Sequence, residues 1–453
     1  MILHGGAKLI SLLLILFNGI LNSGHFPDSW KEVKIKMLAK AGKNKSIPGS
    51  YRPITLSSCV GKLFEKSLKS RIKAMMRRLR AENENQAAYK KRRLCQEHTV
   101  HLTQTVSQAL NERKCVLLFM LDVKGAFDKL WNRGLIYKLH SWGLSTRLLR
   151  CVASFMRERS LRVHEGTAKS RVVNMLAGTP QGSIVSPLLF ILFMDDLKDE
   201  LPDGVRLYQF ADDISLSVVS SCPRAAEWLM QRSLEAIEKW TARWRIELEP
   251  SKSNFIVFSR CPTHRKLRLN LKLHGEKMKE SDDLRFLGIR FDKRLDWSKQ
   301  VEELIAKTNH KIHLLKCISA KDRWANPREV LKFVDAIVTS VFAFATPCCI
   351  TMKSSLWAKL DAIHARAVKS IAGVANFVGY ERVCNQLGIE RWSSALKSAA
   401  FARIEGILKD SPHGAEMLQS NPKGRQTYDS PISLLLDHRR RILQLQQPTA
   451  TTV

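Results

Sequence analysis

The sequence has few acidic residues for its size. Its 453 residues include 42 Asp and Glu against 74 Lys and Arg, which gives a formal net charge of +32 and an isoelectric point near 10.0. An excess of positive charge favours a polyanionic partner, and nucleic acid is the first to consider. Charge describes association and not fold, so an ordinary basic protein remains an alternative on composition alone.

Paired metal-binding cysteines are also lacking. No C-x-x-C pair occurs, and no histidine follows at zinc-finger spacing; Cys261 and His264 form only half of such a site, so we expect no structural zinc. We predict reduced, buried thiols in an intracellular protein. The ten cysteines are Cys59, Cys95, Cys115, Cys151, Cys222, Cys261, Cys317, Cys348, Cys349 and Cys384.

Hydrophobic runs of membrane-spanning length are absent from the sequence pattern. The longest, "LISLLLILFNGIL" at 9–21, has the length and polarity of a signal-peptide core, but Asn18 interrupts it and no convincing cleavage site follows. We therefore predict a buried core helix ended by the turn "NSGHFPDSW". The chain also lacks internal repeats and low-complexity blocks. At 45% hydrophobic residues it is apolar enough for two or three folded domains.

The pattern along the chain divides it into four parts. Residues 1 to about 110 are predicted to be helical segments interrupted by a loop at 39–54, and they include a basic stretch that ends in "KKRR". From 115 to 292, short β-type runs alternate with helical ones, which indicates a mixed α/β or α+β domain. Beyond it a helical, basic region extends to about 405, and the polar remainder is predicted to include a loose tail.

Two adjacent aspartates, Asp212 and Asp213, separate the strand-like runs "VRLYQF" and "ISLSVV". This pattern predicts a tight hairpin. Aspartate is common in turns for local hydrogen bonding, so a purely structural explanation stays open. Two neighbouring carboxylates repel each other, however, and a divalent cation shared with other acids would relieve that repulsion.

A second strand-end aspartate favours the metal hypothesis. The apolar run "CVLLFMLD" reads as a central strand that stops at Asp122. If Asp122 and Asp212 meet at neighbouring strand ends, they can bind two Mg²⁺ ions roughly 3.5–4 Å apart, which is the arrangement for in-line displacement at phosphorus. One ion would activate a 3′-hydroxyl and the other would bind the departing pyrophosphate. We expect Asp128 to be a helix-cap or ion-pair residue.

The segment "LAGTPQGSIVSPLLFILFMDDL" predicts a glycine-rich loop before an apolar helix that begins near 183–187. Gly178 and Gly182 would permit close approach of a ligand, the helix N-terminus would favour phosphate, and the Gln181 amide could bind a sugar or base. Ordinary turn chemistry explains such a loop equally well. The pairs at 195–196 and 282–283 show how little an Asp-Asp dipeptide proves, and we expect both to be solvated boundaries.

Taken in order, "LDVKGAFD", "GTPQGSIVSPLLFILFMDDL" and "FADD" resemble the A, B and C motifs of reverse transcriptases, specifically those of Jockey-type non-LTR retrotransposons. The resemblance covers about residues 10 to 400. It implies the α+β right-hand polymerase fold, and the expected domains follow. They are fingers at 1–114, a palm with motifs A to E at 115–292, a helical thumb or connection at 293–405, and a partly loose C-terminal tail at 406–453.

The resemblance also implies roles for individual residues of the palm. Asp122, Asp212 and Asp213 would be the metal-binding carboxylates, with Asp213 the least direct ligand. The backbone carbonyl of Val123 would complete the metal shell. Phe127 would lie against the sugar as a steric gate that excludes a 2′-hydroxyl.

Further roles are implied around the nucleotide. Gln181 and Gly182 would border the incoming nucleotide, Lys40 and Arg52 would hold its triphosphate, and Lys252 would neutralise or protonate pyrophosphate. Without the family context, solvated loops would explain the two lysines better.

Departures from the family pattern are modest. "QAAYKKRR" replaces the usual Gln-x-Gly-Phe, and Gly125 is expected early in a helix, at a cost of about 1 kcal/mol relative to alanine. The segment "FLGI" at 286–289 resembles the primer-grip hairpin. None of these changes a metal ligand, so we expect intact chemistry.

The implied function is that of an RNA-directed DNA polymerase using two Mg²⁺ ions, or Mn²⁺, with an RNA template, a DNA primer or target and dNTPs, in the nucleus, the cytoplasm or both. We expect a truncated copy or gene-model fragment, because the chain has no room for the endonuclease or ribonuclease H domain of full-length elements. A catalytically silent, nucleic-acid-binding remnant is the main alternative. An RNA-dependent RNA polymerase is disfavoured by Phe127.

Overall fold

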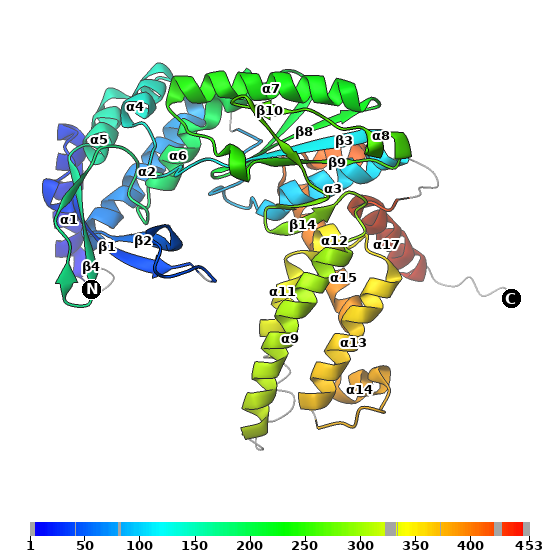
Figure 1. Ribbon diagram of the computed structural model, residues 1–453. Helices are drawn as coiled ribbons and strands as arrows, with labels where there is room; N and C mark the ends of the chain where they lie inside the picture. Colours follow the sequence, from blue (N-terminus) through cyan, green and yellow to red (C-terminus); the bar gives the residue numbers. More distant parts are fainter. Residues whose placement is uncertain are drawn as a thin grey trace.

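The computed structural model describes residues 5–40, 42–79, 83–321, 332, 334–371, 373–420 and 428–446. Figure 1 shows a central sheet between helices, with an N-terminal group of helices and a small sheet on one side and a long helical arm on the other. Helices and strands, parallel and antiparallel pairs, are mixed within one chain. The predicted α+β class is therefore confirmed.

The small sheet belongs to the N-terminal part of the chain. Its strands lie in the order β2-β1-β4-β5, with β6 also paired to β4. They are β1 (Glu32–Ala39), β2 (Tyr51–Leu56), β4 (Arg159–Glu165), β5 (Ala168–Lys169) and β6 (Val173–Met175). The prediction of helical segments and a loop was wrong here. Burial along the first half of β1 alternates, as a half-buried strand requires, and the expected loop contains β2.

Helices pack around this sheet and toward the centre of the molecule. Phe26, Phe64 and Phe155 are fully buried among them, with ring centroids 5.2 Å apart for Phe26 and Phe155. The helices of this part are α1 (Gly6–Ser23), α2 (Cys59–Leu79), α4 (Asn132–Ser141), α5 (Thr146–Met156) and α6 (Ser186–Phe193).

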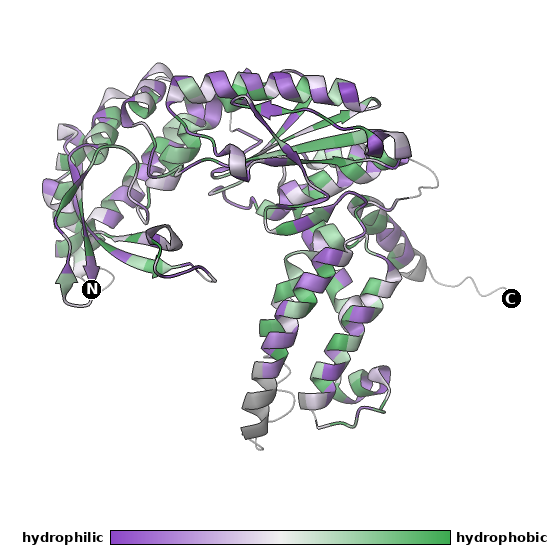
Figure 2. Cartoon of the chain, in the orientation of Figure 1, coloured by the Kyte–Doolittle hydropathy of each residue, from purple (hydrophilic) through white to green (hydrophobic). Residues whose placement is uncertain are grey.

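The central sheet carries the predicted strand-end aspartates. Its strands lie in the order β12-β9-β3-β8-β7, namely β12 (Lys279–Glu280), β9 (Asn254–Phe258), β3 (Cys115–Leu121), β8 (Asp213–Ser220) and β7 (Val205–Phe210). Helix α7 (Pro223–Trp244) covers one face and α3 (Cys95–Asn111) the other (Figure 1). Burial on both faces explains why β3 is a continuous apolar run, and Figure 2 shows the central strands as hydrophobic.

The C-terminal part is helical, as predicted. After the hairpin of β13 (Asp283–Phe286) and β14 (Ile289–Asp292), the arm contains α9 (Ser298–Lys321), α13 (Ser354–Ile371) and α15 (Trp392–Asp410), with the shorter α11 (Ser340–Ala343), α12 (Thr346–Cys349) and α14 (Tyr380–Leu387). The tail, predicted to be partly loose, contains the helices α16 (Gly414–Gln419) and α17 (Pro431–Gln446). Ile432 and Leu435 of α17 are fully buried. Residues 421–427 and 447–453 lie outside the described part of the chain.

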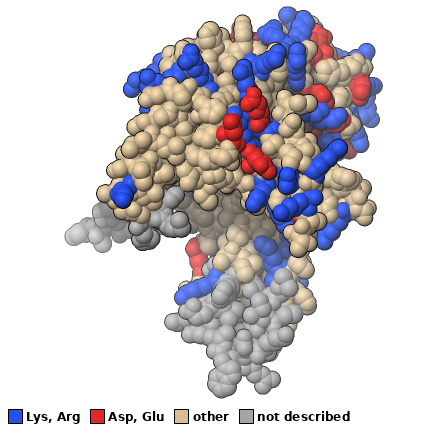
Figure 3. Space-filling model, turned by 90° about the vertical axis from the view of Figure 1, so that its left-hand side faces the viewer, with Lys and Arg blue, Asp and Glu red and all other residues tan. Residues whose placement is uncertain are grey.

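The N-terminal apolar run forms a helix, but it is not a core helix. Only Ile20 and Leu21 of α1 are buried, and both lie near its C-terminal end. Most apolar residues nearer its start are exposed, Ile15 at 70%, and the side of the molecule that α1 borders shows a broad surface without charged residues (Figure 3). By length and composition, α1 is apolar enough to cross a membrane.

The described cysteines are free thiols, but not all are buried. Cys59 and Cys222 are exposed, so burial was wrongly predicted for them. The Cys261 thiol contacts the Thr263 hydroxyl, and the His264 ring contacts Ser259. The side chain of Cys317 lies outside the described residues.

Candidate active site

The turn between β7 and β8 carries the two adjacent aspartates. Phe210 pairs with Asp213 across the hairpin, which leaves Ala211 and Asp212 as a two-residue turn. Ala211 has a φ of 57°, in the left-handed region that primed hairpin turns require at this position. The predicted hairpin is confirmed, with Asp213 as the first residue of β8 and not part of the loop.

Asp122 reaches the same edge of the central sheet. Strand β3 ends at Leu121, as predicted, and Leu121 pairs with Ile214 in the antiparallel β8. Because the two strands are antiparallel, the residue after Leu121 lies opposite the residue before Ile214, and Asp122 therefore lies beside Asp213. Tertiary pairing therefore brings three carboxylates, those of Asp122, Asp212 and Asp213, to one edge of the sheet.

The two turn carboxylates of this edge, those of Asp212 and Asp213, form no ion pair with another described residue. Loss of hydration, followed by the charges of Asp212 and Asp122, raises the pKa of Asp213 to about 6. Partial burial also raises the pKa of Asp212, with a smaller contribution from the charge of Asp122. Like charges held close together disfavour the ionised form.

These carboxylates fit a divalent cation that substrate helps to bind. Among the described residues, no group of three His, Cys, Asp or Glu side chains is arranged to hold a metal ion by itself. Mg²⁺ is commonly held by only one or two carboxylates, with water and substrate phosphates completing its shell. The hard oxygen ligands and the raised pKa values at this edge suit such an ion.

Lys252 lies beside Asp122, although 130 positions separate them in the sequence. Its Nζ is 3.4 Å from Asp122 Oδ2. The segment before and after Lys252 fixes this position, because the Asp122 N–H donates to Ser253 Oγ at 3.2 Å and the Glu249 N–H donates to the Asp122 carbonyl at 2.9 Å. Val123 forms a β-bridge with Leu248 in the same segment.

The glycine-rich loop packs against the turn that follows β3. Gly178 has a φ of 84°, and a Cβ at this position would lie 2.4 Å from the Asp128 carbonyl oxygen. The Thr179 N–H donates to the Phe127 carbonyl at 2.8 Å, and Gln181 Nε2 donates to Asp128 Oδ1 at 2.8 Å. The loop thus fixes the segment that contains the predicted steric gate.

Two expectations about this turn were wrong. Residues 124–128 form turns and not a helix, and Gly125 has a φ of 62°, so glycine is favoured there and carries no helix penalty. Among the described residues Asp128 caps no helix and forms no ion pair; its carboxylate accepts the Gln181 amide.

The second half of the loop reaches the small sheet. The Thr55 N–H donates to the Gln181 carbonyl at 2.8 Å, and a Cβ on Gly182 would lie 3.0 Å from the Thr55 carbonyl oxygen. The two glycines therefore permit close approach of protein backbone, where we had expected a ligand.

Helix α6 begins at Ser186, near the predicted position, and a protein carboxylate binds the residues just before it. The buried Glu65 carboxylate accepts the Ser183 hydroxyl at 2.6 Å and the Ile184 N–H at 2.7 Å. A carboxylate of the protein thus takes the place expected for phosphate.

The predicted nucleotide-contacting side chains form no described hydrogen bond or ion pair with the three carboxylates. Phe127 is half-buried and stacks on Phe190 of α6, with ring centroids 4.5 Å apart. Lys40 Nζ donates to the Gly49 carbonyl at 2.9 Å, and Arg52 is exposed on β2. Within the described part of the chain, neither cation forms an ion pair with the carboxylates.

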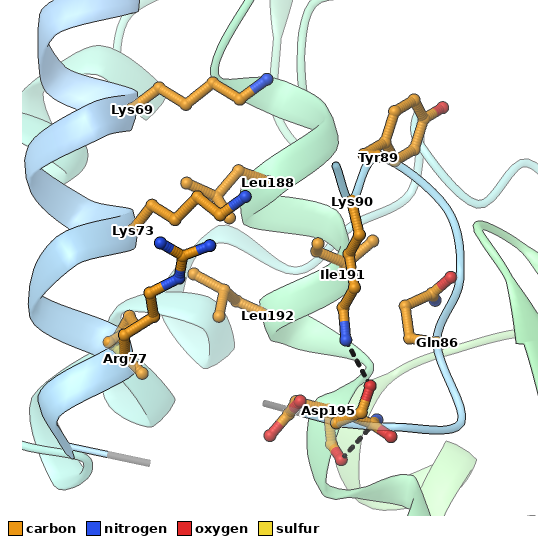
Figure 4. Close-up of a pocket in the computed structure, with 12 residues that line it drawn as sticks. Lys69, Lys73, Arg77, Gln86, Tyr89, Lys90, Leu188, Ile191, Leu192 and Asp195 are labelled. Atoms are coloured by element: carbon orange, nitrogen blue, oxygen red, sulfur yellow. Dashed lines mark hydrogen bonds between the residues drawn. The ribbon is translucent and has the colours of Figure 1, made fainter. Parts of the chain in front are cut away.

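A basic pocket next to the site was not predicted as a site. It has a volume of about 80 Å³, and Figure 4 shows cationic side chains of α2 and Lys90 around apolar residues of α6. Burial, and then the charge of Asp212, raises the pKa of Tyr89, which lines the pocket. The helical spacing of the cations on α2 was the sequence signal that could have predicted this pocket. The residues that line the pocket include Lys69, Lys73, Arg77, Gln86, Tyr89, Lys90, Leu188, Ile191 and Leu192.

The other two Asp-Asp pairs differ from each other. Asp195 is buried, and Asp196 Oδ1 accepts Lys138 Nζ at 2.6 Å and Trp240 Nε1 at 3.0 Å, so the prediction of a solvated boundary was wrong there. Asp282 fits that prediction, since its side chain is 87% exposed. Asp283 is less exposed and begins β13.

The segment predicted as a primer-grip hairpin is a hairpin. Strands β13 and β14 pair through Phe286 and Ile289. Leu287 and Gly288 form the turn, with φ angles of 46° and 85°.

Comparison with known proteins gives consistent matches. A family model described as reverse transcriptase (RNA-dependent DNA polymerase) matches residues 39–291. The chain is 24% identical to "RNA-directed DNA polymerase from mobile element jockey" of Drosophila melanogaster, over 88% of this chain and 44% of that protein. It is 26% identical to the probable RNA-directed DNA polymerase from transposon BS of the same species, over 82% and 41% respectively.

The chain spans less than half the length of these relatives. Among solved structures, apo telomerase from Candida Tropicalis matches with a TM-score of 0.42 and 10% identity, over 91% of this chain and 73% of that one.

Proposed function

The chain belongs to the reverse transcriptase (RNA-dependent DNA polymerase) family, and from this membership we propose that it is the RNA-directed DNA polymerase of a Jockey-type non-LTR retrotransposon. Its reaction would transfer deoxynucleotides from dNTPs to a primer 3′-hydroxyl, with release of pyrophosphate. The observation that carries the proposal is the edge of the central sheet inside the segment that matches the family. Three carboxylates meet there, and the pKa values of two of them, Asp212 and Asp213, are raised.

In this mechanism Asp122, Asp212 and Asp213, with the Val123 carbonyl, would hold two Mg²⁺ ions. Such ions would supply activation of the 3′-hydroxyl and stabilisation of the charge on the leaving pyrophosphate. Asp122 and Asp212 would be the more direct ligands. Lys252, whose ammonium lies 3.4 Å from Asp122, would neutralise or protonate the pyrophosphate as it leaves.

The nucleotide would lie between the carboxylates and the glycine-rich loop. Phe127, supported by Phe190 and by the Thr179 N–H, would exclude a ribose 2′-hydroxyl. Gln181 and Gly182 would border the sugar and base, and Lys40 and Arg52 would bind the triphosphate.

The RNA template and DNA primer would lie across three parts of the chain, with 1–114 as fingers, 115–292 as palm and 293–405 as thumb. The basic pocket supports a template path beside the catalytic turn, because cations around an apolar floor with a tyrosine suit a single-stranded nucleic acid. The turn of residues 286–289 would contact the primer.

Primer extension tests the proposal. The purified chain, given poly(rA)/oligo(dT) with dTTP and Mg²⁺, should extend the primer, and Asp212→Ala should abolish extension. Replacing dTTP with UTP should give little product, and Phe127→Val should raise UTP incorporation. Retained activity in Asp212→Ala would refute the site. Absence of extension in the wild type, together with salt-dependent RNA binding, would instead support a silent nucleic-acid-binding protein.

A further inference from the structure

A short segment before α3, residues 83–88, lies beside β7 at the outer edge of the β7–β8 hairpin. Gln86 forms a parallel β-bridge with Gln209 of β7. The Gln209 N–H donates to the Asn85 carbonyl at 2.9 Å, and the Ala87 N–H donates to the Gln209 carbonyl at 3.1 Å. This segment therefore runs beside β7 up to the turn that carries Asp212.

The side chain of Gln86 continues this contact onto the turn itself. It is only 2% exposed. Its Oε1 accepts the Ala211 N–H at 3.0 Å and the Ala88 N–H at 3.0 Å, and its Nε2 lies 3.5 Å from the Ala211 carbonyl oxygen. One amide thus contacts both backbone groups of the residue immediately before Asp212.

Ala211 needs such support. Its φ of 57° is in the left-handed region, which alanine adopts at a cost, and its exposed fraction is only 7%. A buried N–H that loses its acceptor is strongly disfavoured, so without the Gln86 carbonyl the turn would relax toward another conformation. Any such change would reorient the side chain of Asp212, which is the next residue.

A second side chain supports the same arrangement from behind. Asn83 Nδ2 donates to Gln209 Oε1 at 3.1 Å, and both residues are buried. The segment is therefore fixed to β7 at Asn83, at the Gln86 bridge and at the turn. Figure 4 shows Gln86 on the loop that also carries Tyr89 and Lys90.

We propose that Gln86 is a positioning residue, which holds Ala211 in the left-handed conformation and thereby directs the Asp212 carboxylate toward the metal-binding edge. The proposal rests on the proposed function for its catalytic consequence. Gln86 itself touches neither substrate nor metal in this proposal. Reaction rates are sensitive to displacements of about 1 Å in a catalytic group, so loss of this hydrogen bond should affect chemistry more than binding.

The test compares Gln86→Met with Gln86→Glu. Methionine has nearly the same shape but no strong acceptor, whereas glutamate keeps an oxygen for both N–H groups. Gln86→Met should lower the single-turnover rate of dTTP addition at least tenfold and weaken Mn²⁺ binding, measured by EPR on the protein without nucleic acid, several-fold. Template–primer affinity should stay within twofold of the wild type. Gln86→Glu should recover most of the rate.

Gln104→Met is the matched control. Gln104 is also a buried glutamine, 1% exposed, but its Oε1 accepts the Ile432 N–H of α17. The Gln104→Met variant should lose thermal stability much as Gln86→Met does, but it should keep the wild-type rate of dTTP addition and the wild-type Mn²⁺ affinity.

Three results would overturn the proposal: wild-type rate and Mn²⁺ affinity in Gln86→Met, no recovery in a folded Gln86→Glu, or the same losses in Gln104→Met. If the wild type extends no primer, the proposed function fails, while the Mn²⁺ measurement still decides the role of Gln86.

Discussion

Two Asp-Asp pairs of this chain lie in opposite electrostatic surroundings. At the β7–β8 turn, loss of hydration and the charges of neighbouring carboxylates raise the pKa values of Asp212 and Asp213. At the start of β13, hydrogen bonds from Lys293 and Lys299 lower the pKa values of Asp282 and Asp283 respectively. The dipeptide is the same, but only the second pair has its charge balanced by the protein.

The difference indicates what each pair is for. A carboxylate already paired with lysine is stable as it stands, whereas carboxylates that face one another need a cation from outside. The third pair supports this distinction, because Lys138 balances Asp196 in a buried network with Trp240. Of the three pairs, only Asp212 and Asp213 form no ion pair with another described residue. They lie beside Asp122, whose carboxylate contacts Lys252.

The largest effect should come from removing a carboxylate of the turn edge. Asp122→Asn should lower the rate of nucleotide addition on the order of 10³-fold, because a metal ion that stabilises the transition-state charge would lose a carboxylate ligand. Asp282→Asn, at a side chain 87% exposed, is the matched control and should stay within twofold of the wild type. Steady-state primer extension measures both. Equal rates for the two variants would remove the distinction between the pairs.

The next effect concerns stability and the buried third pair. Lys138→Met should lower the free energy of unfolding by about 3 kcal/mol, since it leaves the Asp196 carboxylate without its cation. The double variant Lys138→Met with Asp196→Asn should recover part of this loss. Urea denaturation of the three proteins measures it. A single variant as stable as the wild type would show that this pair is not balanced by Lys138.

Lys252 should matter for chemistry and Lys299 should not. Lys252→Met should lower the nucleotide-addition rate about 10²-fold if the lysine donates a proton to pyrophosphate. Lys252→Arg keeps the charge, so a recovered rate would indicate neutralisation and not proton donation. Lys299→Met removes a cation from the balanced pair and should leave the rate unchanged. A loss of rate in Lys299→Met would contradict the comparison.

The smallest effect is a difference in pH dependence, measured by urea unfolding between pH 2 and 7 with EDTA present. The folded pKa of Asp213, about 6, lies above its ordinary value of 3.8, so this group's contribution to stability is full at low pH and falls between about pH 4 and 6. Asp213→Asn should remove part of that fall in the free energy of unfolding. The expected part is roughly 1 kcal/mol, because solvent screens the charge of this exposed side chain.

Asp283 should show the opposite sign. Its folded pKa is lowered below 3.8, so its contribution is present above that pH and is lost as the pH falls through the lowered value. Asp283→Asn should therefore destabilise the chain at pH 7, and its effect should shrink as the pH falls below 3.8. The same sign in both variants would contradict the contrast between the pairs.

Much of the site was predictable, because its signals are local. The apolar run ending at Asp122, the hairpin around Asp212 and the turn at 287–288 are each encoded by a few neighbouring residues. Strand β1 could also have been found, since "EVKIKMLA" alternates with period two over its first half. The tail helix α17 was missed because burial of Ile432 and Leu435 depends on distant partners.

The family, the α+β class and the aspartates at the strand ends could be predicted from the sequence alone, because residue types and spacings within motifs carry that information. Tertiary structure decided which charges remain unbalanced. Lys252 reaches Asp122 across 130 positions, and Glu65 occupies the helix start expected for phosphate. Electrostatic energy depends on distance in space and on burial, and neither quantity can be read from spacing along the chain.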